Sequence, residues 1–138
     1  MIPLLLFLIM GTVSDIRERS IPAMIFFIFG LLGTMEYFVS GRTDLINESF
    51  GVILGIVFIA VSYISDSKLG MGDALAILVT GIFLGGTEAA CAVLYAMLIT
   101  AVFSIIILVL RKGTRSTVLP FLPFLLAGYI LEKLGAVI

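Results

Sequence analysis

Two aspartates stand out because each lies where a long apolar run meets a polar connector. Asp15 follows the first apolar run, inside SDIRERSIP at 14–22, and Asp73 ends the segment GMGD at 70–73, next to the fourth run. Two carboxylates that share a poorly screened site resist joint ionisation, so they hold one proton between them. One carboxylate can then activate a water molecule while the other donates its proton to a carbonyl oxygen. The pair therefore indicates peptide hydrolysis of the aspartyl type.

Other catalytic chemistries are poorly supplied by this sequence. The chain has no histidine and one cysteine, which excludes Ser-His-Asp and Cys-His catalysis, a histidine-ligated metal, a cysteine-rich zinc site and an internal disulfide. Serine–lysine catalysis would depend on Lys68, which lies in a connector. We expect no metal and no cofactor. A simpler interpretation of GMGD also exists, in which Asp73 caps a helix and Gly70 and Gly72 turn the chain.

The elements that must position these aspartates are apolar. The chain has 138 residues, of which 62% are hydrophobic and 12% charged, whereas soluble domains are about 45–50% apolar and about 25% charged. Open strands in lipid would leave backbone groups unpaired, so the runs are predicted to be helices. The sequence thus predicts an all-α, polytopic membrane bundle of about six transmembrane helices, with residues 1–138 as a single domain. The six apolar runs are Ile2–Val13, Ile21–Val39, Phe50–Ile64, Ala74–Leu84, Ala89–Leu110 and Leu119–Ile130.

Two glycine patterns indicate close helix packing. GVILG contains Gly51 and Gly55, and GIFLG contains Gly81 and Gly85. Small residues at this spacing let membrane helices approach one another closely. The patterns favour packing and carry little functional weight.

The basic residues predict an orientation in the membrane. Polar connectors separate the six apolar runs, and we number them in chain order. Six of the eight lysines and arginines fall in the first, third and fifth connectors. These connectors are therefore expected in the cytoplasm, with both termini outside. The six are Arg17, Arg19, Lys68, Arg111, Lys112 and Arg115. Both aspartates then lie at the cytoplasmic face. Asp15 would follow a helix C-terminus and Asp73 would begin a helix, so the helix dipoles predict an ionised Asp73 and a protonated Asp15.

Three segments together resemble the type IV prepilin peptidase family of polytopic membrane aspartyl proteases. GMGD at 70–73 resembles its GxGD loop, Asp15 precedes Ile21-Pro22 at the family's distance, and LPFLPFLLAG at 119–128 resembles its Pro-Phe-Gly-Pro-Phe segment. The resemblance implies that Asp15 and Asp73 are catalytic. Residues expected to shape the loops or bind substrate are Gly70, Gly72, Pro22, Pro120 and Pro123. Close approach of a substrate strand would be eased by the missing Cβ atoms of the two glycines.

The sequence also departs from the family pattern. Ala23 stands where an asparagine is common, Leu75 where a lysine is common, and Leu122 where the central glycine would be. The paired-cysteine segment of the larger members with N-methyltransferase activity has no counterpart here. The chain therefore resembles the short, peptidase-only form, as in bacterial tight-adherence pilus systems and archaeal preflagellin peptidases.

The function expected from this resemblance is removal of the short basic leader of prepilin-like or preflagellin-like proteins. Cleavage would follow a glycine at the cytoplasmic face of the inner membrane, with lipid and the substrate protein as the partners. Nucleic acid is not an expected partner, because a net charge of −1 leaves no basic surplus. Two alternatives remain open. One is a small transporter or complex subunit whose two aspartates bind a cation, and the other is a presenilin-like protease, in which a tyrosine, rather than Ser14, would precede the first aspartate.

Overall fold

A computed structural model describes residues 2–18, 21–65, 70–110 and 119–137, and these residues form six α-helices without a strand. The helices are α1 (Ile2–Glu18), α2 (Ala23–Ser40), α3 (Leu45–Ile64), α4 (Met71–Leu84), α5 (Gly86–Val109) and α6 (Leu122–Val137). The all-α prediction is confirmed. Arg19, Lys68, Arg111, Lys112 and Arg115, on which the orientation argument depends, lie outside the described residues.

Helix length separates the six helices into two groups. Three are long and apolar enough to cross a membrane: α2 with 18 residues, α3 with 20 and α5 with 24. The helices α1, α4 and α6 have 17, 14 and 16 residues, at or below the lower limit of about 17 residues for a span. An all-α membrane bundle therefore fits the structure, while six complete spans stay a prediction.

Several helix ends lie away from the ends of the apolar runs. The first run was expected to end at Val13, but α1 continues to Glu18 and carries Asp15 in its last turn. Helix α2 ends at Gly41, whose φ of 63° is the left-handed conformation of a helix C-cap. Helix α3 begins after Asp44, whose side chain accepts a hydrogen bond from the backbone N–H of Asn47.

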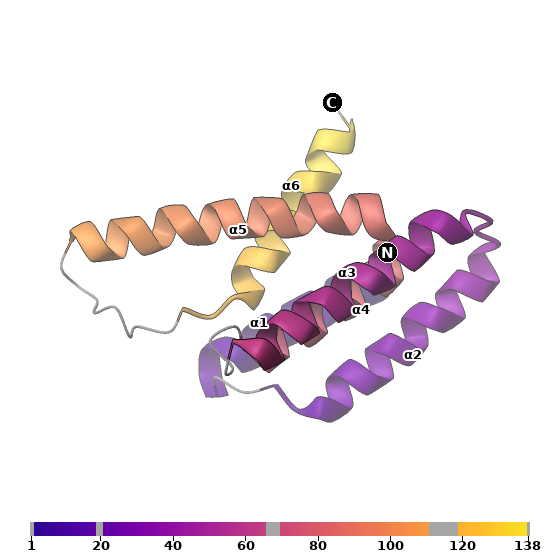
Figure 1. The fold of residues 1–138 in the computed structure, drawn as a ribbon, viewed down its shortest axis with the longest axis horizontal. Coiled ribbons are helices and arrows are strands. Elements are labelled where there is room, and N and C mark those ends of the chain that lie inside the picture. The colour runs from indigo at the N-terminus through magenta and orange to yellow at the C-terminus, as the bar shows by residue number, and fades with distance from the viewer. Residues whose placement is uncertain (1, 19–20, 66–69, 111–118, 138) are drawn as a thin grey trace.

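Glycines bring α3 and α4 together, and Figure 1 shows the two helices side by side. A Cβ on Gly51 would overlap the carbonyl oxygen of Gly81, and a Cβ on Gly81 would overlap that of Gly51. Gly55 lies in the same way against Leu78 of α4. The packing role predicted for these glycines is confirmed at all four positions, because a Cβ on Gly85 would also overlap a side chain of α3. In addition, the φ of 77° at Gly85 ends α4 before α5 begins.

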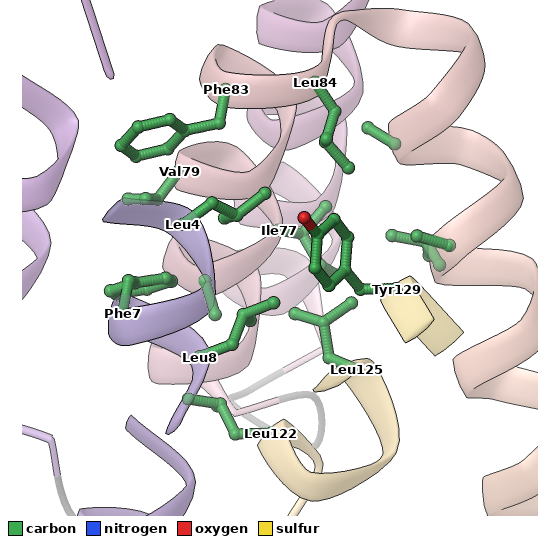
Figure 2. Close-up of a cluster of buried hydrophobic side chains, with 14 of the residues drawn as sticks. Leu4, Phe7, Leu8, Ile77, Val79, Phe83, Leu84, Leu122, Leu125 and Tyr129 are labelled. Atoms are coloured by element: carbon green, nitrogen blue, oxygen red, sulfur yellow. The ribbon is translucent and has the colours of Figure 1, made fainter. Parts of the chain in front are cut away.

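A buried apolar cluster joins the helices that carry the two aspartates (Figure 2). Leu4, Phe7 and Leu8 of α1 are fully buried there, and so are Ile77 of α4 and Leu122 of α6. Burial of large apolar side chains is the main source of packing free energy between elements. The cluster therefore fixes α1, α4 and α6 relative to one another.

Hydrogen bonds hold the other end of the bundle, where α2 leads into α3 and α4 leads into α5. The guanidinium of Arg42 donates to the carbonyl oxygen of Phe83 at 2.7 Å and to the carboxylate of Glu48 at 3.1 Å. Asn47 accepts a hydrogen bond from the backbone N–H of Thr87 at 3.0 Å. The α2–α3 connection is thereby tied to the end of α4 and the start of α5.

Candidate functional site

One cavity of about 460 Å³ brings together three segments that are far apart in the sequence. The end of α1 contributes Asp15, the start of α4 contributes Asp73, and the residues before α6 contribute the third wall. Its lining consists of Asp15, Ile16, Ile21, Gly70, Met71, Gly72, Asp73, Leu119, Pro120 and Phe121. The three segments singled out in the sequence thus meet at one end of the bundle.

Asp15 is held by the first residues of α6. The backbone N–H of Leu122 donates to Oδ2 of Asp15 at 3.3 Å, and the N–H of Phe121 is a second donor. These are the N-terminal N–H groups of a helix, which have no partner within the helix itself. The side chain of Leu122 is fully buried and occupies the space that a Cβ on Gly11 would fill.

Asp73 lies in the first turn of α4. The N-cap position is Gly70, and the backbone N–H of Asp73 donates to the Gly70 carbonyl oxygen at 3.0 Å. The interpretation of Asp73 as the N-cap residue is therefore wrong. A Cβ on Gly70 would lie 2.9 Å from Oδ2 of Asp73, so this glycine leaves room for the carboxylate.

The turn expected of the two glycines is not the reason for their presence. Gly70 has a φ of −57° and a ψ of 131°, which other residues adopt freely. The described glycines with positive φ are Gly41 and Gly85. A Cβ on Gly72 would meet only the Phe26 ring, at an ordinary 3.9 Å. Space beside the Asp73 carboxylate thus explains Gly70, while Gly72 has room for a small side chain.

The two carboxyl groups are electrostatically coupled, and both lie outside the three helices that are long enough to cross a membrane. Burial, together with the negative charge of Asp15, raises the pKa of Asp73 to about 7. Burial also raises the pKa of Asp15 above its usual 3.8, but the N–H groups of Leu122 and Phe121 lower it again in part. These shifts favour the proton on Asp73, whereas the helix dipoles favour it on Asp15.

The prolines occupy different positions around the cavity. Pro120 lines it, whereas Pro22 is the exposed N-cap residue of α2 and Pro123 lies half-buried in the first turn of α6. Neither of these two belongs to the lining. Sequence reasoning missed the apolar walls and the backbone of Leu122. Leu122 lies inside the segment LPFLPF, which the sequence analysis identified, but it was considered there only as a departure from the family pattern.

Within the described ranges, no three His, Cys, Asp or Glu side chains lie together as metal ligands would. Ala23 is exposed at the first position of α2, and Leu75 packs against the apolar cluster. Both lie outside the cavity lining.

The fold and the site define a class: an all-α membrane protein with two coupled aspartates at a cavity where its helices end. Residues 2–105 match the type IV leader peptidase family. The match covers more than half of the chain, so the protein belongs to this family of peptidases. It includes Asp15 and the segment 70–73 and ends before Leu119. No curated protein and no solved structure matches the chain.

Proposed function

We propose that this protein is a membrane aspartyl endopeptidase in which Asp15 and Asp73 are the catalytic residues. Its substrates are prepilin-like or preflagellin-like proteins, whose short basic leader it removes after a glycine. The observation that carries the proposal is the cavity that both carboxylates line, at the junction of three segments. Family membership supports the peptidase class, and the coupled titration of the two aspartates supports shared use of one proton.

The proposed reaction needs only water and the two carboxyl groups. The ionised aspartate takes a proton from water as the water oxygen bonds to the carbonyl carbon, and the protonated aspartate gives its proton to the carbonyl oxygen. The first aspartate then passes its new proton to the amide nitrogen. As the C–N bond breaks, the second recovers a proton from the hydroxyl of the tetrahedral intermediate. The pair thus returns to its starting state.

The walls of the cavity support a preference for a small residue at the cleavage point. Apolar side chains of Ile16, Ile21, Met71 and Phe121 line it beside the aspartates. A helical substrate hides its amides in internal hydrogen bonds, so cleavage requires an extended backbone. Glycine breaks the helix and has no side chain to clash with these walls.

The cavity faces the cytoplasm in this proposal, because the basic connectors favour that orientation. Single cysteines introduced by Glu18→Cys and Thr43→Cys, each in a Cys91→Ser background, test it, since both positions are exposed. With an impermeant thiol reagent on intact cells, the cysteine at 43 should react and the one at 18 should not. The reverse pattern would contradict cytoplasmic cleavage.

The catalytic assignment is tested with purified protein in lipid and a peptide that carries a basic leader, a glycine and an apolar run. Asp15→Asn and Asp73→Asn should each lower cleavage by about 1,000-fold or more, and the double variant should lose little further, because the two groups act as a unit. Asp44→Asn is the matched control, since Asp44 caps α3 and asparagine caps equally well.

Full activity in either single variant would refute the pair. If the unaltered protein cut no such peptide but bound a cation through the two aspartates, the result would favour the alternative function, a small transporter or complex subunit. Isothermal titration of the same preparation with sodium and calcium salts measures that binding.

A further inference from the structure

The N-terminus of α6 meets Asp15 directly. The N–H of Leu122 lies 3.3 Å from Oδ2 of Asp15, across 107 positions of the sequence. Helix α6 is 16 residues long, and the first turn of such a helix carries unpaired N–H groups and a partial positive charge. Both features favour a negative charge on the group that they face.

The geometry of this contact is fixed by packing on both sides. The N–H groups of Phe124 and Leu125 each donate to the carbonyl oxygen of Phe121 at 3.0 Å, which sets the first turn of α6. The fully buried side chain of Leu122 packs where Gly11 has no Cβ. Gly11 precedes Asp15 by one helical turn on the same face of α1. The glycine thus sets the register that brings the Leu122 N–H to the carboxylate.

The titratable groups near Asp15 lie on α4 and further along α1. Among the described residues that line the cavity, Asp73 on α4 is the other titratable group. Arg17 and Glu18, further along α1, are both exposed to solvent. Asp73 begins its own helix, but it is more deeply buried and feels the charge of Asp15, both of which raise its pKa. These opposing influences divide one proton unequally between the two carboxyl groups.

We propose that the N-terminus of α6 is a positioning element that holds Asp15 as the ionised member of the pair and leaves the proton on Asp73. In the reaction proposed above, on which this assignment of roles rests, Asp15 is then the base. It takes the proton from water while the water oxygen bonds to the carbonyl carbon. Asp73 is the acid that gives its proton to the carbonyl oxygen. The backbone of Leu122 acts through Asp15 and does not touch the substrate.

Infrared titration of the carboxyl bands tests the proposal without any cleavage assay. Protein in lipid vesicles is titrated as the Asp15→Asn and Asp73→Asn variants, with the double variant subtracted as baseline, so that each spectrum reports one aspartate. We expect Asp73 to lose its proton at a higher pH than Asp15. The opposite order would overturn the proposal.

A backbone change then tests the role of α6. In the Asp73→Asn background, the amide of Leu122 is replaced by an ester with the same side chain, which removes the N–H and weakens the Phe121 carbonyl as a hydrogen-bond acceptor. The midpoint of Asp15 should rise by about one pH unit, the usual effect of a hydrogen bond to a charged group. The same ester at Leu131, in the second half of α6 and outside the cavity lining, is the matched control and should leave the midpoint in place.

An unchanged Asp15 midpoint with the Leu122 ester, or an equal rise with the Leu131 ester, would refute the role of α6. Because these titrations need no substrate, they separate this proposal from the proposed function. A protein that titrates as expected and cuts no peptide refutes the protease alone.

Discussion

Replacing Asp73 with asparagine should make the protein more stable at alkaline pH. Burial and the charge of Asp15 raise the pKa of this carboxyl from 3.8 to about 7, so the folded state disfavours its ionised form. The contribution of Asp73 to stability should therefore be fully present below pH 4 and be lost as the pH rises toward and through 7. The asparagine side chain carries no charge at any pH, so that loss should disappear in the variant.

The size of the effect follows from the two pKa values. The difference between 3.8 and about 7 corresponds to about 4 kcal/mol at pH 8, where Asp73 is ionised. This figure is an upper bound, because water in the open cavity screens part of the charge. We expect the variant to exceed the unaltered protein by about 1–3 kcal/mol at pH 8, and by close to zero at pH 4.

The measurement is unfolding by sodium dodecyl sulfate in mixed micelles, followed by helical circular dichroism at several pH values between 4 and 8. Glu18→Gln is the control, because it removes the same charge from an exposed position and should leave the pH dependence unchanged. If Asp73→Asn and the unaltered protein showed parallel stability curves across this range, the ionised carboxylate would not be disfavoured in the folded state. The electrostatic description of the cavity would then be wrong.

Two further predictions concern glycines. Gly81→Ala should destabilise the protein by about 2 kcal/mol or more, because the new Cβ would overlap the backbone of Gly51. Gly30→Ala should stabilise the protein by about 0.5–1 kcal/mol, because no heavy atom lies within 4 Å of its new Cβ. The same detergent unfolding measures both, and equal effects would contradict the close α3–α4 contact. Gly70→Ala should slow peptide cleavage about 10- to 100-fold, because its Cβ would displace the neighbouring Asp73 carboxylate, whereas Gly72→Ala should cleave nearly normally. Equal rates for these two variants would show that space at position 70 is not required.

The sequence alone determined the class of the fold and the residues of interest. Its apolar composition left lipid as the solvent and helices as the only spanning element, and the structure confirms an all-α membrane bundle. Asp15 and Asp73 were identified from their positions beside apolar runs. The alternation of helices predicted that both would lie at one end of the bundle, and one cavity is lined by both. Family membership, expected from three short motifs, is also confirmed.

Only the tertiary structure shows which groups surround each aspartate and why Gly70 is a glycine. The helix-dipole argument used each aspartate's own helix, but a different helix supplies the N–H groups that stabilise a negative charge on Asp15. That contact depends on the packing of Leu122 against Gly11, which no local pattern predicts. The Gly70 backbone is ordinary, and its requirement for a missing Cβ arises from the position of the Asp73 side chain. Periodicity and capping follow from near neighbours in the chain, whereas the charge state of a buried carboxyl depends on neighbours that folding brings from elsewhere.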